Sequence, residues 1–207
     1  MDRDKIRRFW QWFKAASARI ASYEEGWFLE GINERVSELD SAIAWEVGPG
    51  TVAPNRLALS PNLDRALLPL TREIVRLAPR IEDWEFLPSR PRKDWLPRFR
   101  LECDDGSELD VDASQWQFLL LVHPDGEREV VLVGESAERV PASQQWTAAA
   151  IVLEGMVGEE LLLERVDSFA MLAHIEERLR VQLRPLADLP SALGTTNRRE
   201  DEHSAHE

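Results

Sequence analysis

Three glutamates and one histidine are the side chains whose types and spacing could support catalysis. Glu154, Glu159 and Glu160 surround the end of a predicted helix, with Glu159 in a turn, and His174 follows on a segment of mixed character. Paired carboxylates can act as general acid and base or assist a metal ion, but no spacing ties the imidazole of His174 to them. The sequence therefore leaves open a hydrolase-type or metal-assisted enzyme, provided that at least two of these groups share one pocket.

A second group combines basic and aromatic side chains in the proline-rich connection "PSRPRKDWLPRF", residues 88–99. Arginine and tryptophan are enriched among the residues that dominate protein interfaces, and loops commonly carry binding residues. We therefore predict a contact site in this connection and add the two glutamates of the helix end to it. The candidate binding residues are Arg90, Arg92, Lys93, Trp95, Glu159 and Glu160.

No other group has the spacing of a catalytic or metal site. The acidic run from Glu102 to Asp112 lacks the ligand positions of a calcium loop. Cys103 alternates onto the apolar side of a predicted strand with Leu101, so we expect a small buried side chain and not a nucleophile. We expect no catalytic residue set, no metal ion and no cofactor.

The charge of the chain is strongly negative and unevenly distributed. The net charge is −13, but residues 1–22 carry six basic and two acidic side chains, so the remainder carries −17. An acidic body disfavours nucleic acid, for which a basic stripe is expected, and permits a basic protein partner. No apolar run approaches the ~20 residues of a membrane span. The N-terminus has no apolar signal core and the chain has one cysteine, so we expect a cytoplasmic protein.

The stretch "KIRRFWQWFK", residues 5–14, is basic, aromatic and periodic. Its apolar positions follow helical spacing, and a second amphipathic segment follows over residues 28–43, which together predict an N-terminal helical hairpin. A basic helix with Trp and Phe on one side can also lie on a membrane surface. We favour the core interpretation because the second helix supplies a packing partner, and peripheral membrane binding remains the alternative.

The middle of the chain predicts a strand at 42–47, its hairpin partner at 56–60 and a strand at 84–88. Between the last two strands, a helix is predicted from Ser60 to Ala78, with Pro69 delaying or kinking it.

Two further hairpins are predicted from their turns. The stretch "RFRLECDDGSELDVD" alternates around a loop of residues 104–106, and this pairs Arg98 with Asp112 and Leu101 with Leu109. The second hairpin turns at residues 124–126.

The C-terminal part predicts a helix over 141–158, a strand over 160–166 and an ambiguous segment over 168–184 that weakly favours helix. We predict one α+β domain over residues 1–193, with a mainly antiparallel sheet, helices packed on one side and the N-terminal helical hairpin. Residues 194–207 are predicted to be a disordered tail.

The order of these pieces resembles an uncharacterised family of bacterial cytoplasmic proteins over roughly residues 1–190. The segments that carry the resemblance are "AWEVGPG", "LALSPNLDRALLPLTREIVRLAPRIEDWEFLPSRPR" and "AAAIVLEGMVGEELLLERVDSF". The matching positions are Ser60, Pro69, Ala78, Pro79, Trp84, Pro91, Arg92, Gly158 and Glu159. This chain departs from the family pattern at residues 87–89 and has a longer segment after Val166. The resemblance implies a bacterial origin and the order of the fold, and no reaction.

The leading hypothesis from the sequence is a non-catalytic protein-interaction module with an acidic surface. A toxin-neutralising or accessory protein with a basic partner is its concrete form. The enzyme that would use Glu154, Glu159, Glu160 or His174, and the peripheral membrane protein, are the alternatives.

Overall fold

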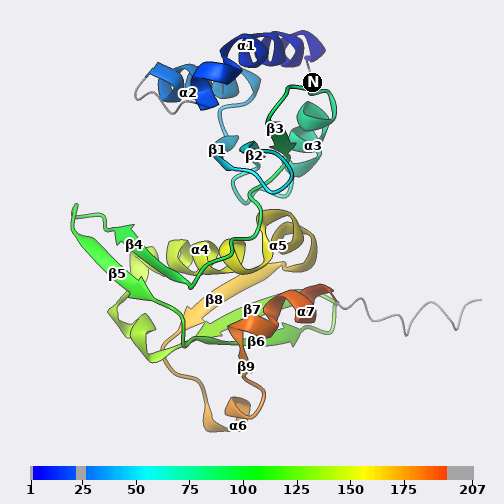
Figure 1. Ribbon diagram of the computed structural model, residues 1–207. Coiled ribbons are helices and arrows are strands. Elements are labelled where there is room, and N and C mark those ends of the chain that lie inside the picture. Colours follow the sequence, from blue (N-terminus) through cyan, green and yellow to red (C-terminus); the bar gives the residue numbers. More distant parts are fainter. Residues whose placement is uncertain (1, 22–26, 195–207) are drawn as a thin grey trace, which may run out of the picture. The chain divides into compact units, whose positions relative to one another are not determined.

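The computed structural model describes residues 2–21 and 27–194 (Figure 1). The chain divides into two compact units, Met1–Pro91 and Arg92–Glu207, whereas the sequence predicted one domain over residues 1–193. The division falls inside the proline-rich connection, which is short enough to be taken for an ordinary loop. The tail predicted for 194–207 lies outside the described residues, apart from Gly194 at the end of a helix.

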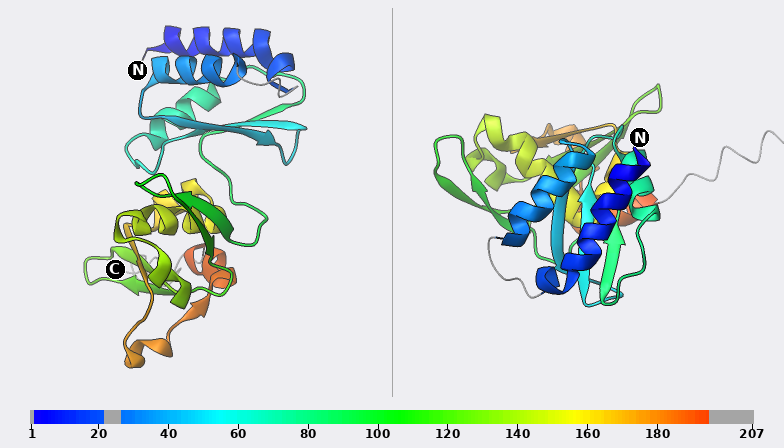
Figure 2. Two further views of the ribbon diagram at one scale, coloured as in Figure 1. Left: turned by 90° about the vertical axis from the view of Figure 1, so that its left-hand side faces the viewer. Right: turned by 90° about the horizontal axis from the view of Figure 1, so that it is seen from above.

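The first unit is a three-stranded sheet with helices on one face (Figure 2). Its elements are α1 (Arg3–Ala21), α2 (Trp27–Leu39), β1 (Ala44–Pro49), β2 (Asn55–Ser60), α3 (Leu68–Arg76) and β3 (Trp84–Leu87). Strands β1 and β2 form the predicted antiparallel hairpin, and β3 joins β2 in parallel. Because parallel strands need a crossover, α3 connects β2 to β3.

The aromatic side of α1 is turned into the core of this unit. Phe9, Trp10 and Phe13 are 2%, 3% and 0% exposed, so the core interpretation of the N-terminal helix is confirmed. The ring of Phe13 meets Trp84 edge to face, with 4.9 Å between centroids. The indole N–H of Trp10 donates to the carbonyl of Ile74 in α3 at 2.9 Å. These contacts fix α1 to the sheet and to α3.

The second helix completes the predicted helical hairpin. Ile32 and Val36 of α2 belong to the same buried cluster as α1. Gly31 allows the close approach, because a Cβ there would lie 3.0 Å from the ring of Trp12.

The helix of the crossover begins later than the sequence predicted. It was expected to start at Ser60, but α3 starts at Leu68. Asn62 and Leu63 have φ angles of 54° and 60°, which a right-handed helix excludes. Pro69 then lies in the first helical turn, where its missing N–H leaves no hydrogen bond unmade.

The second unit contains a two-stranded and a four-stranded sheet. Its strands are β4 (Arg98–Glu102), β5 (Glu108–Asp112), β6 (Gln117–Val122), β7 (Arg128–Val133), β8 (Ser168–Leu172) and β9 (Arg184–Pro185). Its helices are η1 (Glu135–Arg139), η2 (Ala142–Gln144), α4 (Gln145–Val157), α5 (Glu159–Arg165), α6 (Glu177–Arg180), η3 (Leu186–Asp188) and α7 (Leu189–Gly194). The larger sheet has the order β8-β7-β6-β9, with β7 and β8 parallel.

Both predicted hairpins of this unit are confirmed, with their registers. Strands β4 and β5 pair Arg98 with Asp112 and Leu101 with Leu109, as expected. Each loop ends in a glycine with positive φ, 78° at Gly106 and 89° at Gly126. A glycine adopts this conformation without the steric cost of a Cβ, which is why these three-residue loops close.

The segment after α4 differs from the prediction. Residues 160–166, expected as a strand, form the helix α5, and the parallel strand is β8, from the segment expected to favour helix. Gly158, with φ 81°, ends α4 and lets a second helix start at once. Leu162 and Leu163 are then buried on one side of α5. A short apolar run cannot be assigned by its periodicity alone, and here the pairing of β8 with β7 decides.

The helices of the second unit lie on both faces of the larger sheet, so the prediction that they pack on one side is wrong for this unit. Phe118, Leu132 and Met171 are buried on one face, and they follow the register of β6, β7 and β8. On the other face, Leu119 and Val131 contact apolar side chains from the segment around α6. The predicted α+β class is confirmed, with four antiparallel and two parallel strand pairs in the described residues. No helix within residues 2–21 and 27–194 is both long and apolar enough to cross a membrane.

Candidate functional site

The predicted catalytic group is not gathered in one pocket. His174 lines a cavity of about 610 Å³ in the second unit, and Glu154, Glu159 and Glu160 are not among the residues that line it. The three glutamates lie at the junction of α4 and α5. Glu159 is the first residue of α5 and is 0% exposed, so its predicted place in a turn is wrong. The helix turns its side chain to the same side as Leu162, which explains the burial.

The cavity lies at the carboxyl ends of the parallel strands β7 and β8. Gly134 and Ser136 follow β7, and His174 follows β8, so the loops after both strands contribute to its wall. This is a common position for ligand sites in sheets with parallel strands. The Nε2 atom of His174 lies 2.8 Å from Oε1 of Glu138, and both side chains are largely exposed. An exposed pair of this kind contributes little to stability, but it orients the imidazole.

A hydroxyl group also lines the cavity, and its hydrogen bonds are already made. The Oγ atom of Ser136 accepts from the indole N–H of Trp116 at 2.6 Å and donates to the carbonyl of Asp112 at 3.0 Å. Trp116 lies against Gly134, where a Cβ would come within 2.2 Å of the ring. Because its hydroxyl proton is donated to a backbone carbonyl and not to a side-chain base, Ser136 is not activated as a nucleophile. It positions the indole of Trp116 instead. The sequence missed this network because its members come from two distant segments, residues 112–116 and 134–136.

The basic and aromatic connection is held to α4 by Trp95. A Cβ at Gly155 would lie 2.4 Å from its ring, and the backbone N–H of Lys93 donates to the carbonyl of Gly155 at 2.8 Å. The ammonium of Lys93 lies 5.5 Å from the same ring. Arg90 belongs to the first unit and Arg92 to the second. Trp95 thus serves in packing, and Arg92 and Lys93 are the exposed members of the group.

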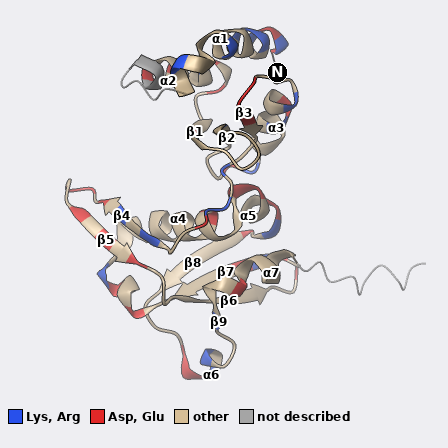
Figure 3. Ribbon diagram, in the orientation of Figure 1, with Lys and Arg blue, Asp and Glu red and all other residues tan. Residues whose placement is uncertain are grey.

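The outer face of the β4–β5 hairpin carries only charged side chains. Two are arginines and four are acidic, and the loop between the strands adds Asp104 and Asp105. The outer-face residues are Arg98, Arg100, Glu102, Glu108, Asp110 and Asp112. Arg100 bonds Asp110 at 3.0 Å and Glu108 at 2.9 Å, and Arg98 bonds Asp112 at 2.9 Å. The hairpin keeps a surplus of negative charge after these pairs, as Figure 3 shows along β5.

Hydrogen bonds keep two carboxylates of this hairpin ionised. The hydroxyl and backbone N–H of Ser114, with a smaller effect of Arg98, hold the pKa of Asp112 below its usual value. The hydroxyl and backbone N–H of Ser107 do the same for the pKa of Asp105. Both groups are therefore anionic at neutral pH.

The negative charge of the chain belongs almost entirely to the second unit. Residues 1–91 carry 13 basic and 14 acidic side chains, whereas residues 92–207 carry 12 basic and 24 acidic ones. A surplus of one charge on a surface raises the rate of association with ligands of the opposite charge.

The remaining candidates are possible metal ligands and the single cysteine. In the described part of the chain, no group of three His, Cys, Asp or Glu side chains could hold a metal ion. Cys103 is half-buried, not fully buried as predicted, because it lies at the end of β4 where the hairpin loop begins.

No family model, no curated protein and no solved structure matches this chain. Its function is therefore inferred from the residues and their geometry alone.

Proposed function

We propose that this protein is a non-catalytic interaction module whose second unit contacts a basic partner protein through the outer face of the β4–β5 hairpin. The toxin-neutralising or accessory role expected from the sequence is the concrete form of this proposal. The observation that carries it is the surplus of exposed carboxylates on a two-stranded hairpin whose register fixes them on one face.

The geometry of the hairpin favours electrostatic contact over catalysis. The exposed fractions of Asp110 and Glu108 are 81% and 62%, so their carboxylates are open to a partner's cations. The opposite face is apolar and attaches the hairpin to the unit, since Leu101 and Val111 are 3% and 5% exposed. A rigid strand pair presents its charges at fixed spacing, which favours a specific partner over diffuse attraction.

The test removes charge from the hairpin and compares the effect on binding with that of removing an equal charge elsewhere in the same unit. The triple variant Glu102→Gln, Glu108→Gln, Asp110→Asn removes three charges from the outer face. The control Glu127→Gln, Glu176→Gln, Glu177→Gln removes three from other exposed positions of the same unit. Binding of a labelled peptide of alternating Lys and Ala is measured by fluorescence anisotropy at two salt concentrations, and basic proteins are captured from extracts of the native host.

We expect the hairpin variant to weaken peptide binding about tenfold and the control less than threefold, because three lost contacts of about 0.5 kcal/mol each sum to about 1.5 kcal/mol. A basic protein captured by the wild type should be lost with the hairpin variant and retained with the control. Equal retention in both variants would show that the hairpin is not the contact surface.

A further inference from the structure

A groove runs along α1 on the first unit and ends at the C-terminal end of α3. Its volume is about 500 Å³. Ile6, Trp10, Leu77 and Pro79 form its apolar floor. Ile6 and Trp10 are themselves 2% and 3% exposed, so the floor is shallow and firmly held by the core beneath it.

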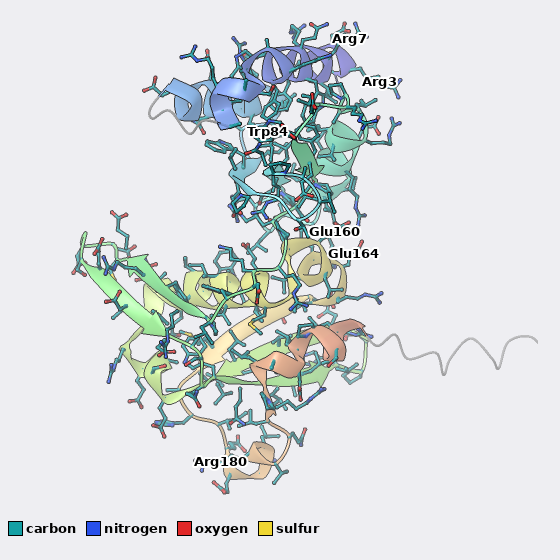
Figure 4. The ribbon with its side chains drawn as sticks, in the orientation of Figure 1. Arg3, Arg7, Trp84, Glu160, Glu164 and Arg180 are labelled. Carbon is teal, nitrogen blue, oxygen red and sulfur yellow. The ribbon has the colours of Figure 1, made fainter. Side chains whose placement is uncertain are left out.

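Three cations stand along the α1 side of this groove: Arg3, Arg7 and Lys14. Arg3 and Arg7 extend from α1 into open space (Figure 4). From Arg3 to Lys14 the three cations span eleven residue steps of one helix, which is about 16 Å at 1.5 Å per residue. The groove thus combines a row of positive charge with an apolar strip.

The cations are only partly compensated by the rest of the unit. Arg7 pairs with Asp4 at 3.1 Å and both side chains are 67% exposed, while Arg3 lies 3.8 Å from Glu73. No carboxylate in the described part of the chain is within ion-pair distance of Lys14. Exposed pairs of this kind exchange readily for a competing carboxylate.

We propose that this groove binds an acidic amphipathic helix of a partner protein. The partner's carboxylates would pair with Arg3, Arg7 and Lys14, and one or two of its apolar side chains would lie over Leu77 and Pro79, the half-buried part of the floor. A helix laid in a groove is a recurrent mode of peptide recognition, and its spacing of three to four residues matches a row of cations on α1.

Two other anionic partners fit less well. A nucleic acid would pair its phosphates with the cations but would leave the apolar floor of the groove uncovered. A membrane would need apolar side chains that project from α1, and Phe9, Trp10 and Phe13 are buried in the core. The charge and the apolar strip together favour the helix.

The probe is a labelled peptide of about 14 residues, long enough to span the cations, with Glu and Leu at helical spacing. A matched peptide has Gln in place of every Glu. Binding to the full chain is followed by fluorescence anisotropy. The groove variant is Arg7→Glu with Lys14→Glu. The control variant is Lys5→Glu with Arg8→Glu, which changes the charge of the same helix by the same amount at exposed positions that do not line the groove. Thermal unfolding establishes that both variants fold.

We expect the groove variant to weaken binding of the Glu peptide at least tenfold and the control variant less than threefold. The Gln peptide should bind at least tenfold more weakly than the Glu peptide. Equal losses in both variants would overturn the proposal, because α1 would then act only through its overall charge. Binding to vesicles of anionic lipid without binding to the peptide would also overturn it, as would salt-sensitive self-association that the groove variant abolishes.

Discussion

The substitution Phe13→Ala tests whether the basic aromatic helix belongs to the core. Phe13 is fully buried in α1, and its ring meets those of Trp84 and Phe86 edge to face, with centroids 4.9 and 5.5 Å away. Removing the ring would leave a cavity between α1 and the sheet. The helix could fill it only by moving toward β3.

The magnitude follows from the burial and from the aromatic contacts. Replacing a buried Phe by Ala typically lowers the free energy of unfolding by about 3–5 kcal/mol. We expect the upper part of this range, since each edge-to-face contact adds about 0.5–1.5 kcal/mol beyond burial. With a urea dependence of about 2 kcal/mol per molar, the midpoint of unfolding should fall by about 2 M. Phe13→Leu, which retains most of the volume, should cost roughly a third as much.

Urea unfolding followed by circular dichroism and tryptophan fluorescence provides the assay, and hydrogen exchange assigns the loss to the first unit. Lys14→Ala is the matched control, because Lys14 is the next residue of the same helix and is exposed. Its substitution should change the stability by less than about 0.5 kcal/mol.

The refuting result is specific. If α1 used its aromatic side to bind a membrane, Phe13→Ala would leave the midpoint of unfolding near that of the wild type and would reduce binding to anionic vesicles. A shift in the midpoint no larger than that of Lys14→Ala would therefore show that the burial of Phe13 does not stabilise the fold.

Two other perturbations test local features of the structure. Gly134→Ala should destabilise the second unit by about 1–3 kcal/mol and change the fluorescence of Trp116, because the new Cβ would overlap its ring. The control Gly126→Ala, at positive φ in open space, should cost about 1–2 kcal/mol without a change in fluorescence. Urea unfolding combined with emission spectra distinguishes the two variants. Hydrogen bonds from Ser114 and Arg76 lower the pKa values of Asp112 and Glu73, respectively. The stability that these bonds contribute is therefore present above the usual pKa values of 3.8 and 4.5 and is lost as the pH falls below them. Asp112→Asn should flatten the acid side of a plot of the unfolding midpoint against pH, and an unchanged profile would count against the bonds to Asp112.

The two hairpins could be predicted from the sequence because their information is local. Alternation of apolar and polar residues fixes the face of each side chain, and a glycine at the left-handed position fixes the length of the loop. One residue of slip would place Leu101 opposite a charged side chain. The same holds for α1, where the spacing of Phe9 and Phe13 determines the buried side without reference to the rest of the chain.

The errors arose where distant pairing decides the structure. The run "ELLLERV" satisfies both a strand and a short helix, and the place beside β7 is taken by β8 instead. The start of α3 was missed because Asn62 and Leu63 adopt left-handed conformations that neither residue type requires. The division into two units was missed because the connection at Pro91 carries no flexible composition.

The candidate sites show the same limit. The acidic hairpin was visible in the sequence, since its register assigned every charge to a face. The cavity beside His174 was not, because its wall forms only when the segments after β5, β7 and β8 are brought together. Glu159 could be recognised as buried only once α5 was known to be a helix.

The net charge of the chain conceals how its charges are distributed. The value of −13 suggests one acidic surface, yet residues 1–91 are nearly neutral in sum while α1 presents a row of cations. That row exists because the aromatic half of α1 is needed by the core, so its polar half must face water, and the sequence has filled that half with arginine and lysine. Solubility alone would be served equally well by glutamate at these positions. The positive sign of this exposed helix face is therefore not explained by folding, and it is the feature on which the proposed binding of an acidic helix rests.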